Sequence, residues 1–421
     1  MLAAESPAAP SAALDPDDHR ALAARLDLLH FQDEAPGMAF WHPRGFALYR
    51  VLEEAARRHV LAGGYQEVRT PQLLRRSLWE QSGHWQHHRQ DMFVVEHDGE
   101  GSAASAAALK PVSCPGHIQL ARRAAPSWRD LPLRVAEMGL CHRDERSGAL
   151  HGLLRLRQFT QDDGHIFCAE DQAAGEAARF CRGLFAFYRD FGFDDVAVAL
   201  STRPAERAGD DAGWDRAEAV LSEVAAGLGV DVIHQPGAGA FYGPKLEFLL
   251  PDRRGRRWQL GTIQLDLVLP QRFDVDYVAA GGDRRPCVML HRALYGSLER
   301  FMGILLERHG AALPPHLAAE QVAVVAVAPA QAEWAEAVAR RLAGAGLRIR
   351  VLGGDDSLGR RIAIAHQLGV PFVAVVGARE VAAGAVAVRG PGGAQEVRPL
   401  DEAVAALVAR CAWPHVGSAP A

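Results

Sequence analysis

Hydrophobic positions recur with a helical period over residues 47–64, ALYRVLEEAARRHVLAGG, and a glycine pair ends the run. The strand-like segment YQEVRTP follows directly, and mixed helix and strand patterns continue to about residue 312. Before this region, residues 1 to about 18 are rich in Ala, Pro and Ser, which is typical of a disordered segment. A helix is predicted to begin at DPDDHR, where an acidic residue can cap it.

The C-terminal quarter has a different pattern. After the linker-like LPPHLA, the strand-like runs QVAVVAVA, LRIRVL, PFVAVVG and AVAVRG alternate with the helix-like runs QAEWAEAVARRLAGAG and SLGRRIAIAHQLG. This alternation predicts a small α/β domain with a largely parallel sheet. The chain contains no internal repeat.

Composition narrows the class of protein. With 421 residues, of which 49% are hydrophobic and 23% charged, the chain is long enough for two domains, three at most. No apolar run approaches the roughly 20 residues of a membrane helix, and the N-terminus has no signal-peptide pattern, so a cytoplasmic protein without membrane contact is expected. Six scattered cysteines predict reduced thiols rather than a disulfide framework.

Lysine is almost absent. Lys110 and Lys245 are the two lysines of the chain, and arginine supplies every other basic side chain. A position that keeps lysine against such a bias can need a compact ammonium in place of a planar guanidinium. Both lysines are therefore candidate functional residues. The net charge of −5 leaves nucleic-acid binding open, because a local basic surface is enough to bind a polyanion.

Residues 143–168, RDERSGALHGLLRLRQFTQDDGHIFC, concentrate opposed charges. Glu145 can accept a hydrogen bond from an adenine amino group, and Phe159 can stack on a flat base. The segment also carries arginines that can neutralise a triphosphate: Arg143, Arg155 and Arg157. A nucleotide site is one interpretation, and a salt-bridged surface hairpin is the alternative.

Within this segment, CHRDE and LRQFTQDDGH resemble motif 2 of the class II aminoacyl-tRNA synthetases, and HRALYGSLERFMGILLE resembles motif 3. Further segments resemble the threonyl-tRNA synthetases in order over residues 17–410: APGMAFWHPRG, YQEVRTPQLL, SLWEQSGHW, SCPGH, LSTRPAER, GWDRAEA, GAFYGPKLEF and GTIQLDLVLP. On these motifs the chain is identified as a member of the threonyl-tRNA synthetase family.

The resemblance implies an α+β catalytic domain, built on an antiparallel sheet flanked by helices, over residues 31–312. An α/β anticodon-binding domain is expected over residues 317–421, and residues 1–30 are expected to form an N-terminal extension. Pro71 matches the motif 1 proline at the family's dimer interface, so the resemblance implies a homodimer. The alternative for Pro71 is a simple strand terminator.

For ATP, the resemblance assigns Arg143 to the α-phosphate, Glu145 to the adenine amino group and Arg155 to the outer phosphates. Phe159 and Arg300 would hold the adenine ring between them. Positioned guanidiniums, with Mg²⁺, suit this reaction because attack of a carboxylate on the α-phosphorus builds negative charge.

Three further residues are assigned by the same resemblance. Gln259 would contact ATP, and Lys245 would place a charge near the reacting carboxylate and the α-phosphate. His42 would assist transfer to the terminal ribose, since a histidine can relay the proton released when that hydroxyl attacks. A purely structural histidine is the alternative for His42.

The family also has a catalytic zinc, and its ligands match Cys114, His165 and His291. Three protein ligands leave positions open for a substrate, as a catalytic zinc requires. In the family these positions accept the amino and hydroxyl groups of threonine, which discriminates against valine far better than packing does. Around the substrate, the resemblance places Asp163 at the hydroxyl and lines the pocket with Gln161, Tyr242 and Gln264.

The chain departs from the family's pattern at three positions within the matched motifs. Val112 and Ser113 replace Met and Asn next to Cys114, and Ala238 replaces a glutamate in the GAGAFYGPK segment. The chain also begins just before the catalytic domain, so an enzyme without the N-terminal editing region is expected. Residues 317–421 contain ten arginines, no lysine and nine acidic residues, a net charge of about +1, which is low for a tRNA-binding domain.

The sequence therefore predicts a threonine–tRNA ligase that uses ATP, Mg²⁺ and Zn²⁺ to form threonyl adenylate and transfers threonine to tRNA. Three alternatives stay open. The same adenylating centre could load a different acceptor in specialised biosynthesis, or the chain could be an inhibitor-resistant second copy of a housekeeping synthetase. A non-catalytic tRNA-binding or regulatory protein is the alternative from another class.

Overall fold

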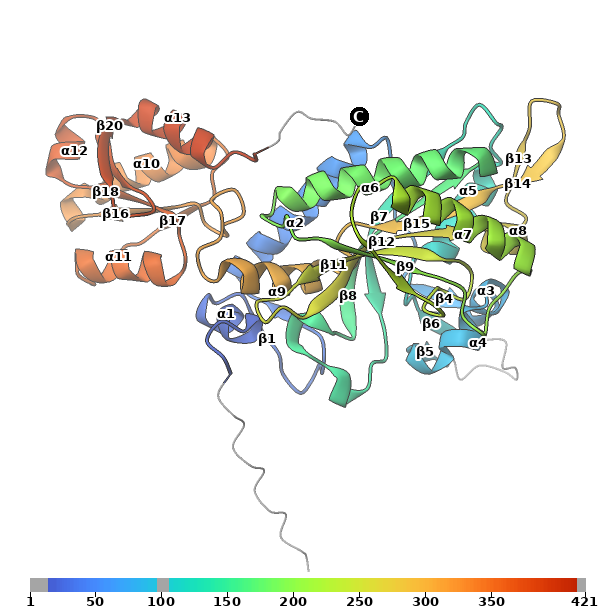
Figure 1. The fold of residues 1–421 in the computed structure, drawn as a ribbon. Coiled ribbons are helices and arrows are strands. Elements are labelled where there is room, and N and C mark those ends of the chain that lie inside the picture. Colours follow the sequence, from blue (N-terminus) through green and yellow to red (C-terminus); the bar gives the residue numbers. More distant parts are fainter. Residues whose placement is uncertain (1–13, 97–105, 415–421) are drawn as a thin grey trace, which may run out of the picture.

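The computed structural model describes residues 14–96 and 106–414. Its larger part is an eight-stranded sheet, with a smaller five-stranded sheet at the C-terminal end of the chain (Figure 1). In spatial order the large sheet consists of β10 (Val232–Gln235), β9 (Ala197–Ser201), β11 (Lys245–Pro251), β12 (Arg257–Asp266), β15 (Val288–Ala293), β8 (Gln158–Cys168), β7 (Leu133–His142) and β3 (Gln66–Glu67). Its central pairs are antiparallel, and the two outermost pairs, β10 with β9 and β3 with β7, are parallel.

Alternating residues of the central strands separate two apolar cores. Ile166 and Leu290 join the larger core, whereas Phe167 and Met289 point to the opposite face and join a smaller one. This alternation is the ordinary two-residue period of a strand. The larger core receives α1 (His19–Arg25), α2 (Pro43–Ala62), α6 (Ala173–Arg189), α7 (Asp211–Ala226) and α9 (Leu298–His309). The smaller core receives α5 (Cys114–Ala124) and α8 (Leu269–Arg272), which leave the rest of that face open for a site.

The remaining elements of the large domain are short. A three-stranded sheet carries two small helices beside the open face: β4 (Leu73–Arg75), β6 (Ala107–Leu109), β5 (Val94–Val95), α3 (Arg76–Ser82) and α4 (His84–His88). Two separate hairpins pair β1 (Leu29–His30) with β2 (Phe40–Trp41), and β13 (Asp276–Val278) with β14 (Arg284–Pro286).

The predicted N-terminal helix forms, but it belongs to the larger domain. Asp18 caps α1, because its Oδ1 accepts a hydrogen bond from the backbone N–H of Arg20 at 2.9 Å. His19 then meets Glu307 of α9, with 2.7 Å between Nδ1 and Oε1. Leu22 and Leu26 are buried in the larger core. The described residues before position 31 therefore pack as part of the domain that was expected to begin there. The predicted disorder of residues 1–13 lies outside the described residues.

The two local predictions around α2 differ from the structure at their ends. The helix begins at Pro43, before the predicted periodic run, because proline is well suited to the first helical position. The strand-like YQEVRTP gives only the two residues of β3. Its later part leaves the sheet before Pro71, which has no N–H to donate to a neighbouring strand.

The C-terminal domain is a three-layer α/β unit. Its sheet has the order β17 (Ile349–Val351), β16 (Val322–Ala326), β18 (Phe372–Val376), β19 (Ala385–Arg389) and β20 (Gln395–Pro399). In Figure 1 the helices α10 (Ala332–Gly344) and α13 (Leu400–Arg410) lie on one side of this sheet and α11 (Leu358–Gln367) on the other, and each side has its own apolar core. A short helix, α12 (Ala378–Ala382), precedes β19.

The prediction of a largely parallel sheet is right for one half of this domain. The pairs of β16 with β17 and with β18 are parallel, whereas β18, β19 and β20 are antiparallel. The sequence analysis missed β20 because most of its residues are polar and exposed, as befits an edge strand.

Two further predictions concern the cysteines and membrane-spanning segments. All six cysteines are free thiols, as expected for a chain without a disulfide framework. Among the described residues, every helix is too short or too polar to cross a bilayer.

Candidate active site

A cavity of about 580 Å³ opens on the face of the large sheet that carries α5 and α8. Its walls come from the central strands, from α4 and α5, and from the segment before β11. Eleven residues selected from the sequence line it together: Cys114, Arg143, Glu145, Arg155, Gln161, Asp163, His165, Tyr242, Lys245, Gln264 and His291. Segments far apart in the chain thus meet in one cavity, which excludes the interpretation of residues 143–168 as an isolated surface hairpin.

At the floor of the cavity, Cys114, His165 and His291 form a compact cluster. One potential ligand atom from each residue lies within 4.8 Å of the others, and all three residues are buried. His165 and His291 face each other across β8 and β15, so that His165 Nε2 lies 3.1 Å from His291 Nδ1. One thiol and two imidazoles are a ligand set suited to zinc.

The outward nitrogens of the two histidines have partners of their own. His291 Nε2 lies 2.9 Å from Asp266 Oδ2, and His165 Nδ1 lies 2.6 Å from His117 Nδ1. Such partners fix the ring orientation and leave the inward nitrogens available to a metal. Burial raises the pKa of the Cys114 thiol well above its ordinary value, so a cation beside it is needed to hold the thiolate. The residues present therefore fit a zinc ion.

Beside this cluster lie the side chains that the family resemblance assigned to binding of the threonine substrate. The Tyr242 hydroxyl donates to Gln264 Oε1 at 2.9 Å, and the Tyr242 ring stacks on His291 with 4.6 Å between ring centres. Asp163 accepts a hydrogen bond from the backbone N–H of Ser113 at 3.1 Å. Gln161 lines the same wall. A hydroxyl-bearing substrate next to the metal cluster would thus meet fixed acceptors.

The arginines and the glutamate of the motif 2 segment line another part of the cavity. Arg155 and Glu145 pair at 2.9 Å, and the Arg143 guanidinium lies over the Phe159 ring, 5.0 Å from its centre. Phe159 itself is buried and is not among the lining residues. This end of the cavity combines the positive charge of Arg143 and Arg155 with the carboxylate of Glu145, groups that can bind the phosphates and the amino group of an adenine nucleotide.

Arg300 lies behind this end on α9. Its Nε donates to the carbonyl of Leu154 at 2.9 Å, and its Nη1 donates to the carbonyl of Gln259 at 3.0 Å. Burial, with repulsion from Arg143, lowers the pKa of Arg300 to about 10. Gln259 contacts Arg300 through its backbone, and neither residue lines the cavity.

His42 is not brought together with the other predicted site residues. It lies at the N-terminal end of α2, where its Nδ1 is 2.6 Å from Asp27 Oδ1 and its Nε2 is 2.8 Å from His30 Nδ1. The cavity is lined by a different histidine, His84, whose Nε2 lies 3.6 Å from Cys114 Sγ. Burial lowers the pKa of His84 to about 3, which keeps the ring neutral. Sequence reasoning quoted its motif, SLWEQSGHW, but did not assign His84 a role.

The departures from the family's pattern leave the predicted ligand atoms in place. Val112 lines the cavity, whereas the hydroxyl of Ser113 is buried without a hydrogen-bond partner among the described residues. The contact from Ser113 to Asp163 uses the backbone N–H, so it does not depend on the side chain. Ala238 is exposed in the turn before Gly239 and does not line the cavity.

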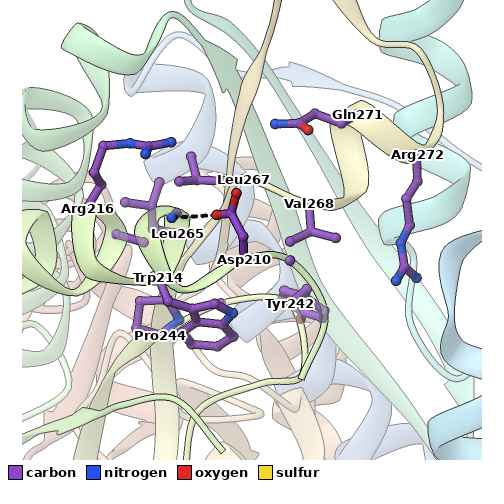
Figure 2. A pocket seen from close by; sticks show the side chains of 14 residues that line it. Asp210, Trp214, Arg216, Tyr242, Pro244, Leu265, Leu267, Val268, Gln271 and Arg272 are labelled. Carbon is purple, nitrogen blue, oxygen red and sulfur yellow. Dashed lines mark hydrogen bonds between the residues drawn. The ribbon is translucent and has the colours of Figure 1, made fainter. Parts of the chain in front are cut away.

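A second cavity, of about 410 Å³, lies on the other side of the segment from Tyr242 to Pro244, and Tyr242 lines both cavities. Figure 2 shows its apolar floor around Trp214 and its polar rim. Asp210 caps α7 there, since its Oδ1 accepts a hydrogen bond from the backbone N–H of Gly213 at 2.7 Å. This cavity contains none of the residues assigned to ATP or the metal.

A buried carboxylate joins the strand of Phe159 to the helix of Arg300. Both oxygens of Glu299 face the backbone N–H of Thr160, at 2.9 and 3.0 Å, and Ser297 Oγ donates to Oε2 at 3.0 Å. Burial raises the pKa of Glu299 to about 7. Glu299 therefore fixes the spacing between β8 and α9, and with it the spacing between Phe159 and Arg300.

The chain matches two family models. Residues 93–309 match the class II tRNA synthetase core domain (G, H, P, S and T), and residues 321–410 match the anticodon-binding domain. The chain is 52% identical over 375 residues to the threonine–tRNA ligase of Cupriavidus pinatubonensis, and 51% identical over 375 residues to that of Cupriavidus necator. Each of these matches spans 89% of this chain and 58% of the relative, so the chain covers little more than half the length of these relatives.

Solved structures are similar to nearly the whole chain. The RNA-binding domain of threonyl-tRNA synthetase from Cryptosporidium parvum superposes with a TM-score of 0.90 at 35% identity, over 95% of this chain and 100% of that one. A putative threonyl-tRNA synthetase from Aeropyrum pernix superposes with a TM-score of 0.78 at 28% identity, over 94% of this chain and 96% of that one.

The buried position of Glu299 predicts a pH-dependent stability. Its pKa rises from 4.5 to about 7 on folding, so between these values the folded chain keeps a proton that the unfolded chain releases. The free energy of unfolding should therefore fall as the pH rises through this window. In Glu299→Gln this fall should be smaller, and the residual slope should include Asp162, whose pKa burial raises to about 6.

Urea titrations at several pH values measure this effect. The exposed Glu336→Gln serves as the surface control and should keep the wild-type slope. A Glu299→Gln variant with an unchanged slope would show that Glu299 does not hold the proton.

Proposed function

This chain belongs to the threonyl-tRNA synthetase family of class II synthetases, and we propose that it activates L-threonine with ATP and transfers the threonyl group to tRNA. The observation that carries this proposal is a single cavity in which the arginines of motif 2 and the Cys114, His165 and His291 cluster both line the wall. A nucleotide and a small metal-bound substrate can thus meet there.

In the first step, a carboxylate oxygen of threonine attacks the α-phosphorus of ATP. A carbon–oxygen–phosphorus link forms, and the bond to the leaving pyrophosphate breaks. Arg143 reaches into the cavity and neutralises the charge that builds on the α-phosphate, which is how fixed cations lower such barriers. Lys245 lies in the same wall, 2.7 Å from Glu247, and adds a second positive charge.

The nucleotide is proposed to lie along the motif 2 residues. Arg155 binds the outer phosphates when it exchanges its contact with Glu145 for them, and Glu145 is then free to accept from the adenine amino group. Phe159 and Arg300 hold the ring plane from β8 and α9. Mg²⁺ accompanies ATP as in phosphoryl chemistry generally.

The amino acid is proposed to lie over the Cys114, His165 and His291 cluster, which would hold zinc. A bound zinc would act as a Lewis acid that takes the amino and hydroxyl groups of the substrate. Asp163 accepts a hydrogen bond from the hydroxyl and so orients it, while Tyr242 and Gln264 close the pocket around the side chain. Valine has no hydroxyl, so it would leave these polar groups unpaired.

For transfer to the ribose, the position of His84 suits the role that the sequence analysis gave to His42. His84 lines the cavity with a neutral imidazole, because burial lowers its pKa, and the ring nitrogen without a proton can accept a hydrogen bond from the ribose hydroxyl. His42 is held by Asp27 and His30 outside the cavity wall.

A homodimer is the proposed assembly. Pro71 is exposed, and Leu73, two residues further along the chain, is 42% exposed. On α2, Phe46 and Leu61 are 49% and 50% exposed. Together with the match of Pro71 to the motif 1 proline, these exposed side chains are where we propose that a second copy of the chain packs.

The contacts of the arginines in the C-terminal domain favour weaker tRNA binding than the number of these arginines suggests. Arg348 donates to the carbonyls of Ala318 and His316, at 2.9 Å each, and Arg350 pairs with Glu320 at 3.1 Å. Arg361 is buried and donates to backbone carbonyls. Side chains engaged in this way have fewer N–H groups left for phosphates. For this reason, transfer of the threonyl group to an acceptor other than tRNA is the second candidate function.

The first test is threonine-dependent exchange of pyrophosphate into ATP. The wild-type chain should catalyse it, and Arg143→Ala should lower kcat about 100-fold or more, because it removes charge stabilisation at the α-phosphate. Arg146→Ala is the matched control, since Arg146 is an exposed arginine of the same segment that does not line the cavity, and it should keep the wild-type rate. Absence of exchange with any amino acid in metal-replete protein would favour the non-catalytic binding protein.

The second test concerns the metal. Elemental analysis should find about one zinc per chain, and Cys114→Ala should lose it. Cys181→Ala, which changes another buried cysteine on α6, should retain it. Threonine should be activated about 10⁴-fold better than valine, since a site built to bond a hydroxyl rejects an isostere without one. Active protein free of zinc would refute the metal centre.

The third test decides the acceptor. Charging of threonine tRNA, and of a version with an altered anticodon, should be measured together with binding at several salt concentrations. We expect both to be charged, with a shallow fall of affinity with salt, because the slope scales with the number of phosphates neutralised. Steep salt dependence with strong anticodon discrimination would contradict the weak-binding domain. Adenylation without charging of either tRNA would favour the other acceptor.

A further inference from the structure

A continuous chain of buried polar contacts leads from His165 away from the cavity. His165 Nδ1 lies 2.6 Å from His117 Nδ1, and His117 Nε2 lies 3.1 Å from Glu137 Oε2. Glu137 also accepts from Lys110 Nζ at 2.7 Å and from Thr70 Oγ1 at 2.7 Å. Each member of the chain therefore has a defined partner on both sides.

These residues lie deep in the protein. Lys110 and His117 are fully buried, at 0% exposure, and Glu137 is 3% exposed. A buried ion pair is costly unless its charges are well compensated, and a half-satisfied network is worse than an apolar core. Lys110, one of the two lysines of the chain, supplies a compact ammonium here that bonds both Glu137 and Thr70. The contacts with His117, Lys110 and Thr70 therefore fix the position of the Glu137 carboxylate.

Local structure explains how the contacts are set. Cys114 and His117 are one helical turn apart at the start of α5, so that both side chains reach β8 from the same helix. Glu137 lies on β7, whose antiparallel register with β8 places Val135 opposite His165 and Glu137 opposite Asp163. Glu137 therefore points to the same face as His165, two residues along the neighbouring strand.

We infer that His117, whose ring is held by Glu137, is the positioning residue for the proposed metal ligand His165, so this inference rests on the proposed function. A metal on His165 Nε2 requires the ring proton on Nδ1, and this Nδ1–H then donates to His117 Nδ1. His117 in turn carries its proton on Nε2 and donates it to Glu137. One set of tautomers thus satisfies every contact from His165 through His117 to Glu137. It is the set in which His165 Nε2 is free for the metal.

The charge on Glu137 makes this arrangement directional. Burial opposes the charge, but hydrogen bonds from His117, Lys110 and Thr70 lower the pKa of Glu137 to about 2. An ionised Glu137 has no proton to donate, so His117 must donate to it. The carboxylate thereby sets the orientation of both imidazoles.

The other histidine ligand has a shorter version of the same support. His291 Nε2 reaches Asp266 Oδ2 directly at 2.9 Å, and Asp266 is held by the backbone N–H groups of Val268 and Leu269 at 2.7 and 2.9 Å. His165 reaches its carboxylate through one additional imidazole. Each histidine ligand is thus oriented by a buried carboxylate.

The sequence alone allows another interpretation of His117. In SCPGH the spacing of Cys114 and His117 resembles a pair of metal ligands on one helical turn. The structure does not support this interpretation, because both ring nitrogens of His117 are already engaged, one by His165 and one by Glu137.

Two substitutions at His117 separate positioning from packing. Asn places its side-chain oxygen near the position of Nδ1, so His117→Asn keeps an acceptor for His165. Gln extends toward the position of Nε2, so His117→Gln keeps a donor for Glu137 but loses the contact with His165. Neither variant removes Glu137 or Lys110, so neither leaves a buried charge without its opposite.

The zinc dissociation constant of metal-free protein, measured by competition with a chelating dye, is the readout. His117→Gln should bind zinc about 10 to 100-fold more weakly, as expected for loss of a partner of a ligating histidine. His117→Asn should stay closer to wild type. The control is His316→Gln, which breaks the contact of another buried histidine far from the cavity, His316 Nε2 with the Asp190 carbonyl at 3.0 Å, and should leave the zinc affinity unchanged.

Each outcome has one meaning. Equal zinc affinity in wild type and His117→Gln would overturn the inference and leave the proposed metal centre intact. Equal weakening in His117→Asn, His117→Gln and His316→Gln would also overturn it, because it would indicate a general loss of packing. A wild-type chain that binds no zinc would overturn both the inference and the metal centre. Weakening confined to His117→Gln would support the inference.

Discussion

The antiparallel register of β8 against β15 sets His165 directly opposite His291, and the rest of the site is arranged around that pair. Residues opposite each other in such a ladder have their Cβ atoms about 5 Å apart on the same face. A shift of one residue would turn either histidine into the apolar core on the other side of the sheet. The next strand continues the pattern, since Gln264 on β12 lies opposite His291. Helix α5 then supplies Cys114, the third residue of the cluster.

This arrangement places charged and polar groups inside the protein, where each must be compensated. Lys110 and Glu137 form a buried pair, and Asp162 binds the backbone N–H groups of Leu294 and Tyr295, at 2.6 and 2.9 Å. Glu299 is treated similarly by Thr160. In each case a buried acid ties one element of the site to another. The charges therefore contribute specificity of geometry, because any other spacing would leave an acceptor without a donor.

The sequence predicted elements more reliably than their meeting points. Periodicity found α2 and, in the C-terminal domain, α10, α11 and the strands β16 to β19, because their apolar residues recur with a clear period, but it did not identify α12 or α13. It missed β20, which has no apolar face. The convergence of Cys114 with His165 could come only from matching family motifs, since cross-strand pairing leaves no local pattern in the chain. For the same reason the analysis assigned a role to His42 and none to His84, because only the fold shows which histidine reaches the cavity.

The junction between the domains follows the same physical rule as the site. Arg44 on α2 donates to the carbonyl of Leu26, to that of Leu368 at 2.5 Å, and to Glu320 at 2.6 Å, and it is 6% exposed. Leu26 belongs to the larger domain, whereas Leu368 follows the last residue of α11 in the C-terminal domain. A buried guanidinium that bonds both domains resists their separation, because opening the junction would leave its donors and the carbonyls unpaired before water reached them. Helix α2 also packs into the larger core on one face of the large sheet, so Arg44 ties the C-terminal domain to an element of that core rather than to a loop.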